Sequence, residues 1–452
     1  MHFSFTYVQR TALALATMLT VVACSDDDDE ANNGSDNVSN TSADCADTGM
    51  VTDEPDTEMN TPAVEGAFEA ITVITFDDTG TLYVGDSGTG QIHALTPPAG
   101  ENPSAGQPYN LQNIDTTLAE LIGTTPNQIR VRDLAVHPAT TEAYIAVAWP
   151  NGDTMQSTIA VMNQTGTARL LETEATEAVM LPFAPTDDFL FYDDFPSRDL
   201  SITDLTVHGG MLYIAGMSNA DFASTLWTIP VPFGQNEPSV TTVEIYHGVH
   251  GQLETRAPIR TMTISQIDGE PMVLAAYTCT PLVAFPVADL QDGAHIVGQT
   301  IGELGYGNTP GDMISFDVQS MEGDVTTMLF IQNKNQSAQV IPMPVIAGAV
   351  AQPGIEEPLG FEKVDLGAFE TPMTGILQIE DQDPGRLLSI RRDAEAGDLE
   401  MVSYLKNVYF RLSDFQSEYE VPNYVYPPDQ EGIKQFQNMM KIDEGHPDTV
   451  VD

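Results

Sequence analysis

Basic residues are scarce in this sequence. Its 452 residues include 16 Lys and Arg against 66 Asp and Glu, giving a formal charge of −50, and no Lys or Arg lies between Arg10 and Arg130. Binding to nucleic acid or to anionic lipid requires basic patches, so the composition argues against both partners. The hydrophobic fraction of 42% is nevertheless enough for a sizeable core, which excludes a wholly disordered chain.

Cysteine is scarce as well. Cys24, Cys45 and Cys279 are the three cysteines, and none belongs to a Cys-x-x-Cys motif or a mixed Cys/His cluster. The pattern therefore favours neither a zinc nor an iron–sulfur site. Two hypotheses stay open for Cys45 and Cys279: a disulfide formed in an oxidising compartment, or two free thiols.

The hydrophobic run at the N-terminus is short. Thr11–Val22 follows Arg10 and has the length of a signal-peptide core rather than of a membrane span. It ends in Val21-Val22-Ala23-Cys24, which resembles the bacterial lipobox. The resemblance implies a lipoprotein signal peptide over residues 1–23, lipidation of Cys24, and contact with the membrane through this anchor only. The alternative is an ordinary buried terminal helix.

Residues 24–65 contain 13 acidic residues and no basic one. Such a segment buries too little apolar surface to offset its ordering entropy, so we expect a disordered acidic tether. Ser25 after the cysteine resembles the outer-membrane sorting signal of proteobacterial lipoproteins, and implies a place in the bacterial cell envelope, at the periplasmic face or the cell surface. Residues 66–452 keep 53 acidic and 15 basic residues, a balance typical of salt-adapted surfaces.

From about residue 70 the pattern changes to short alternating strands separated by Gly, Asp, Asn and Pro turns, which predicts an all-β fold. A unit of roughly sixty residues recurs six times. Its first strand is expected at Thr72–Phe76, Arg132–Val136, Thr203–Val207, Arg260–Ile264, Gly311–Ser315 and Thr374–Gln378. Its second strand is expected at Thr81–Gly85, Glu142–Val147, Met211–Gly216, Pro271–Tyr277, Val325–Gln332 and Arg386–Ile390.

A single four-stranded sheet cannot cover both of its faces, whereas sheets arranged radially bury each face against a neighbour. We therefore predict a six-bladed β-propeller with four-stranded antiparallel blades over residues 66–415, and a tail over 416–452 packed on its outside. A single β-sandwich is the alternative. The stretch Ile74–His93, with its Asp78-Thr79-Gly80 hairpin, resembles a blade of the NHL and gluconolactonase-like six-bladed propellers.

Residues at the starts of inner strands converge on the central channel of a propeller. Asp133, Asp204 and Asp312 hold matching positions there, and Arg260 lies among them. We expect these four residues, with Asn308 of the Gly-rich loop before Asp312, to bind a ligand, and the three aspartates to be the ligands of any bound Ca²⁺. The alternative is that the aspartates hydrogen-bond neighbouring blades. His247 and His250, with His208, would bind a transition metal if folded together, although such a pair is more often a surface feature.

The sequence contains no complete catalytic set. We therefore predict a lipid-anchored envelope module that binds an envelope protein or a small ligand without converting it, with no cofactor beyond Ca²⁺. The rival hypothesis comes from the gluconolactonase-like resemblance, which implies a metal-dependent hydrolase of the lactonase type working from the channel carboxylates. The Glu-Gly-Pro opening of that family is missing here, and Pro150-Asn151-Gly152 follows a second strand instead of preceding an inner one.

Overall fold

The computed structural model describes residues 68–406 apart from residues 99, 153, 173, 186–189, 192–194, 279, 306–309, 321–322, 334–337, 360–363, 365, 368, 372–375 and 393–396. The predicted signal peptide, the tether and the tail over 416–452 therefore lie outside the described residues, as do Cys24, Cys45, Cys279 and Asn308. Among the described helices, none has the length and apolar character needed to cross a membrane.

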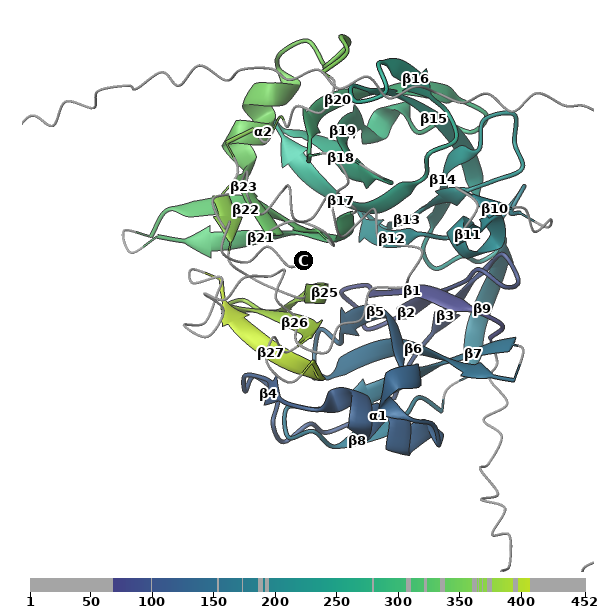
Figure 1. Ribbon diagram of the computed structural model, residues 1–452, viewed down its shortest axis with the longest axis vertical. Coiled ribbons are helices and arrows are strands. Elements are labelled where there is room, and N and C mark those ends of the chain that lie inside the picture. Colours follow the sequence, from purple (N-terminus) through teal and green to yellow (C-terminus); the bar gives the residue numbers. More distant parts are fainter. Residues whose placement is uncertain are drawn as a thin grey trace, which may run out of the picture. The chain divides into compact units, whose positions relative to one another are not determined.

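The chain is mostly β-structure in a propeller-like arrangement (Figure 1). Four sheets have four strands each, and every pairing within them is antiparallel. In sheet order they are β1 (Ile71–Phe76), β2 (Leu82–Asp86), β3 (Gln91–Leu95) and β9 (Ala175–Met180); β5 (Arg130–Val136), β6 (Ala143–Asn151), β7 (Thr154–Met162) and β8 (Ala168–Leu170); β21 (Pro310–Gln319), β22 (Val325–Asn333), β23 (Ala338–Pro342) and β24 (Phe369–Thr371); β25 (Ile376–Asp383), β26 (Arg386–Arg392), β27 (Leu399–Leu405) and β4 (Asn110–Leu111).

The middle of the chain forms one larger sheet of nine strands. One antiparallel part contains β12 (Asp204–His208), β13 (Met211–Met217), β14 (Ser224–Pro230), β15 (Ser239–His247) and β16 (Gln252–Glu254), and the other contains β17 (Ile259–Ile267), β18 (Glu270–Tyr277), β19 (Pro281–Pro286) and β20 (His295–Glu303). A parallel pairing of β15 with β20 joins the two parts. Because β12 also contacts β17, this sheet nearly closes into a barrel, unlike the six separate sheets that we predicted.

The first strand of each predicted unit lies at the inner edge of its sheet. β1 contacts β5 and β12, β17 contacts β12 and β21, and β25 contacts β21 and β5, so these strands form a closed circuit. Figure 1 shows them grouped around the middle of the view. The first and second strands predicted from the alternation all overlap strands of the structure, and the hairpin at Asp78-Thr79-Gly80 is confirmed: Gly80 has φ 88°, and Asp77 Oδ1 accepts from Thr79 N and Thr81 N, both at 2.9 Å.

The core lies between sheets rather than within one layer. Six hydrophobic clusters each join the apolar side chains of two neighbouring sheets or sheet parts around the circuit. Successive residues of the second strands point to opposite neighbours: Leu387 packs against β22 and β23, and Leu388 packs against β5–β7. This explains why these strands are apolar at nearly every position instead of alternating with polar residues.

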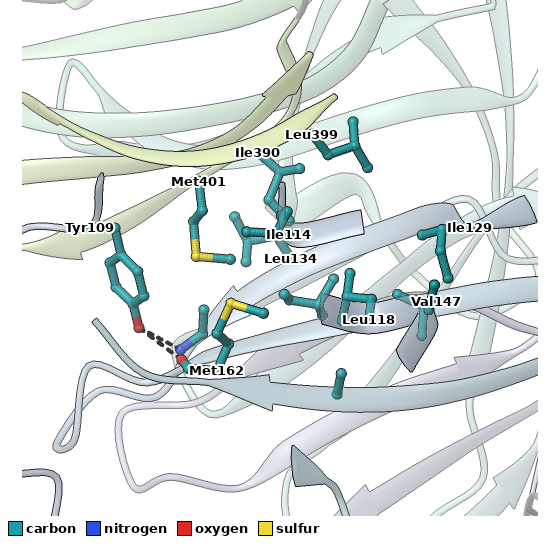
Figure 2. Close-up of a cluster of buried hydrophobic side chains, with 14 of the residues drawn as sticks. Tyr109, Ile114, Leu118, Ile129, Leu134, Val147, Met162, Ile390, Leu399 and Met401 are labelled. Atoms are coloured by element: carbon teal, nitrogen blue, oxygen red, sulfur yellow. Dashed lines mark hydrogen bonds between the residues drawn. The ribbon is translucent and has the colours of Figure 1, made fainter. Parts of the chain in front are cut away.

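Two strands complete sheets that lie far from them in the sequence. β9 returns after the β5–β8 sheet to become the outer strand of the β1–β3 sheet, and β4 pairs with β27 through Leu111↔Met401 and Asn110↔Val402. Tyr109, just before β4, is 1% exposed; its backbone N–H donates to Ser403 Oγ of β27 at 2.7 Å, and its hydroxyl accepts from Ala143 N of β6 at 3.0 Å (Figure 2). The N-terminal part of the fold thus closes the circuit against its C-terminal part.

Two helices and three 3₁₀ turns accompany the strands in the described part of the chain. α1 (Ile114–Ile122) lays Ile114, Leu118 and Ile122 into the cluster between β5–β7 and β26–β27 (Figure 2). α2 (Met343–Val350) buries Met343 and Ile346 against β18–β23. The short elements are η1 (Pro126–Gln128), η2 (Ser197–Leu200), η3 (Val287–Asp289) and the ribbon of β10 (Leu190–Phe191) with β11 (Phe195–Pro196).

Candidate functional site

Residues of all six inner strands line a partly open central cavity of about 160 Å³. Carboxylates from four of these strands line it: Asp133 of β5, Asp204 of β12, Asp312 of β21 and Glu380 of β25, the last with its neighbour Asp381. Residues with hydroxyl groups supply much of the remaining lining: Thr75, Thr206, Thr263 and Ser315. The structure therefore brings the three predicted aspartates to one place, and adds Glu380, which sequence analysis missed.

The three aspartates share one pattern of hydrogen bonds. Each accepts from the N–H of the residue that follows it, at 2.7–2.8 Å, and from an N–H of the neighbouring inner strand. The second bonds run from Ile74 N to Asp133 at 2.6 Å, from Met262 N to Asp204 at 2.5 Å and from Ile379 N to Asp312 at 2.8 Å. The aspartates thus join β5 to β1, β12 to β17 and β21 to β25, which is the alternative role that sequence analysis left open.

Local backbone geometry places these side chains. The strand register shifts just before Asp133 in β5 and just before Asp312 in β21, with corresponding shifts near the starts of β1, β17 and β25. A β-bulge redirects the following side chain and increases the local twist. The bulges therefore redirect the side chains of Asp133 and Asp312, whereas β12 pairs with β13 without a register shift at Asp204.

Burial and mutual repulsion raise the pKa of these carboxylates. Burial, with the charge of Asp312, raises the pKa of Asp204 to about 7, and burial raises that of Asp312 to about 7. The same two causes hold the pKa of Asp133 well above its usual range. Burial, with the charges of Asp312, Asp381 and Asp204, raises the pKa of Glu380 to about 8. These four carboxyl groups therefore hold a proton to higher pH than exposed Asp and Glu side chains do.

Arg260 lies beside this cavity rather than in its lining. It occupies the bulge of β17, and its buried Nε has no hydrogen-bond partner among the described residues. Burial lowers the pKa of Arg260, the carboxylate of Asp204 raises it, and nearby Arg132 lowers it again. Arg260 therefore lies near Asp204 but outside the cavity lining, and its role in ligand binding stays a prediction.

A second cluster of ionisable side chains lies at the end of the β15–β16 hairpin. Glu254 Oε2 is 3.2 Å from His247 Nδ1, and Glu254 Oε1 is 2.5 Å from His250 Nδ1. These ligand atoms lie within 4.8 Å of one another, and no other His, Cys, Asp and Glu group in the described part of the chain meets that limit, the channel aspartates included. Burial raises the pKa of Glu254, but the hydrogen bonds from both histidines outweigh it and lower the pKa to about 2.

His247 is not the surface residue that its sequence context favoured. Its side chain is 1% exposed, and Nε2 lies 3.0 Å from Thr280 Oγ1, whose hydroxyl donates to the fully buried Glu303. His208, which sequence analysis grouped with this pair, lies in β12 outside the cluster. The spacing His-x-x-His-x-x-x-Glu over 247–254 was the available sequence signal, because a tight hairpin brings its ends together.

Comparisons with known proteins leave the family open. No protein-family model matches the sequence, and no curated protein matches it. Similar solved structures include the extracellular domains of Drosophila semaphorin 1a, at 10% identity over 75% of this chain and 86% of that chain with a TM-score of 0.33. Another is the PQQ-bound aldose sugar dehydrogenase of Streptomyces coelicolor, at 9% identity over 75% of this chain and 94% of that chain with a TM-score of 0.26. Likenesses this weak establish neither family nor activity.

Proposed function

We propose that the chain is a six-bladed propeller of the cell envelope that binds a small cationic ligand in its central cavity without converting it. In this proposal the nine-stranded sheet is two blades, β12–β15 and β17–β20, each with the antiparallel order of the other four. Six inter-sheet clusters and a closed circuit of six inner strands support this division. The β15–β20 pairing is then a contact between the outer edges of adjacent blades.

One observation carries the choice of ligand: four carboxylates line one partly open cavity, and the charge of Asp312 raises the pKa of Asp204 and of Glu380. A positive charge placed there relieves the repulsion, and the surrounding hydroxyl groups offer neutral oxygen ligands. The aspartate oxygens are too far apart to converge on one bare ion. We therefore propose that the ligand is either a hydrated metal cation or a small organic cation.

The same aspartates support binding rather than catalysis. Both oxygens of Asp133 and of Asp204 already accept backbone N–H groups, so each carboxylate is held in a structural position and its lone pairs are partly used. A general base must instead reach the proton that it abstracts. Glu380 differs, because the hydrogen bond described for it is local, from Asp381 N at 2.7 Å.

Calorimetric titration of the purified protein with Ca²⁺, and separately with a small organic ammonium ion, tests the proposal. We expect one of these probes to bind at one equivalent, and Glu380→Gln to weaken that binding at least tenfold. Glu270→Gln, which makes the same substitution at the exposed start of β18, is the matched control and should bind as wild type. If neither probe binds, or if both variants behave alike, the proposal fails.

The lactonase-type hydrolase remains the second candidate, and the raised pKa of Glu380 is the observation that favours it, because a group titrating near neutral pH is suited to acid–base chemistry. Acid release from lactones, measured with and without Ca²⁺, separates the two functions. Ca²⁺-dependent turnover lost in Glu380→Gln would establish the enzyme.

The proposed location in the cell envelope rests on the sequence around Cys24. Cys24→Ala should move the protein from the membrane fraction to the soluble fraction, because the variant cannot receive a lipid. Persistence of the variant in the membrane fraction would refute lipid anchoring.

A further inference from the structure

We propose that His247, His250 and Glu254 bind one divalent transition-metal ion, with Zn²⁺ as the ion that best suits the donors. The site lies where the parallel pair of β15 and β20 ends: His247 is the last residue of β15, and Glu254 is the last residue of β16. This site is independent of the central cavity.

The contact with Thr280 determines which nitrogen of His247 is available to a metal ion. The Thr280 hydroxyl has a single hydrogen, and it donates that hydrogen to Glu303 Oε2. Thr280 Oγ1 can therefore only accept from His247 Nε2, 3.0 Å away, so Nε2 carries a hydrogen. His247 Nδ1 is then the atom directed at Glu254 and His250, and a bound metal would replace the hydrogen through which Nδ1 bonds Glu254. This is the geometry of a metal-binding imidazole whose other nitrogen is held by a second partner.

The donor set selects the class of metal. Two imidazole nitrogens and one carboxylate are ligands that Zn²⁺ uses in three-ligand sites, whereas Ca²⁺ and Mg²⁺ prefer oxygen alone. The side chain of His247 is 1% exposed, that of Glu254 14% and that of His250 41%, so the buried end is preorganised and the exposed end admits an ion from solvent. A fourth coordination position is left for water.

The partners behind His247 are also held in place. Gly248 N donates to Glu303 Oε1 at 2.7 Å, and a Cβ on Gly248 would come within 2.9 Å of that oxygen and 3.0 Å of Leu359. Glycine at this position therefore allows the loop after β15 to approach Glu303 closely. The chain Glu303–Thr280–His247 corresponds to the carboxylate-to-histidine support that orients ligands in metal sites.

Titration of the purified full-length protein with Zn²⁺, and with Co²⁺ as a spectroscopic probe, tests this site. We expect one equivalent of tightly bound metal and visible Co²⁺ bands typical of nitrogen and oxygen donors. His250→Ala and Glu254→Gln change partly exposed side chains, and each should weaken Zn²⁺ binding at least tenfold. Thr280→Val should weaken it about 10- to 100-fold without removing a ligand.

Matched variants keep the two proposals separate. His208→Ala removes a histidine outside the cluster and should bind Zn²⁺ as wild type, as should Glu380→Gln, which alters only the central cavity. Unchanged Zn²⁺ binding in both His250→Ala and Glu254→Gln would overturn the proposal. A strong sulfur-to-cobalt charge-transfer band would also overturn it, because it would place the metal on a cysteine.

Discussion

At the scale of single residues, hydrogen bonds from buried and half-buried polar side chains join neighbouring sheets. Asp133, Asp204 and Asp312 each bond two inner strands, and Tyr109 bonds the β25–β27 sheet to the β5–β8 sheet. That the three aspartates lie together could be predicted, because they occupy matching positions in a repeat. Glu380 could not be predicted, because it is the fifth residue of β25 and not at its start. Thr280 and Glu303 could not be predicted either, since both come near His247 only through pairings distant in sequence.

Tyr109→Phe should lower the free energy of unfolding by about 1–3 kcal/mol. The ring still fills its site, but the buried Ala143 N–H loses its acceptor, and the carbonyls of Thr141 and Met162 lose their shared donor. Tyr213→Phe is the control, because no hydrogen bond to its hydroxyl is made by the described residues. Urea unfolding of both variants measures the difference, and equal stabilities would contradict the role given to the Tyr109 hydroxyl.

The raised pKa values of the cavity carboxylates predict a stability that falls as pH rises. Glu380 titrates near 8 in the folded state and near 4.5 unfolded, so between these values the folded state binds the extra proton. Its contribution is complete below pH 4.5 and is lost as pH rises through 8, at up to about 1.4 kcal/mol per pH unit for each such group. Unfolding free energies at pH 5 to 8.5 should therefore decline.

Glu380→Gln isolates this contribution from the charge of the whole molecule. The variant cannot titrate at position 380, so its stability should depend less steeply on pH than that of wild type, while Glu270→Gln should keep the wild-type slope. A stability that increases between pH 5 and 8, or equal slopes in all three proteins, would show that the carboxylate is not held protonated.

At the scale of elements, the alternation of the sequence predicted the first and second strands well, because period-2 patterns and Gly or Asp turns are local signals. It could not predict β4, which has only two residues and whose partner β27 lies near the other end of the fold. The parallel pairing of β15 with β20 could not be predicted either, since the sequence of each strand is typical of an ordinary outer strand. Long-range pairing leaves no pattern within one segment.

The pairing of β4 with β27 can be tested by a cross-link. Asn110 and Val402 are direct partners, so Asn110→Cys with Val402→Cys should form a disulfide in a background where Cys45 and Cys279 are serine. The bond should raise stability by about 2–4 kcal/mol and change mobility on a non-reducing gel. Asn110→Cys with Leu405→Cys, which are not partners, is the control; efficient cross-linking of that pair alone would refute the register.

At the scale of the whole molecule, the unbalanced charge should make stability depend on salt. Residues 66–452 carry 53 acidic and 15 basic side chains, and the described ion pairs use few of the acidic ones. The remaining carboxylates repel one another across the surface, and repulsion between exposed charges is screened within a Debye length of about 10 Å at 0.1 M salt and about 3 Å at 1 M. Raising NaCl from 0.1 to 1 M should therefore raise Tm by several degrees at pH 8.

Sucrose at equal osmolarity is the control, because it favours compact states without screening charge. If NaCl leaves Tm unchanged, or stabilises no more than sucrose does, then the surface charges are already compensated and the acidic composition has no energetic cost to the fold.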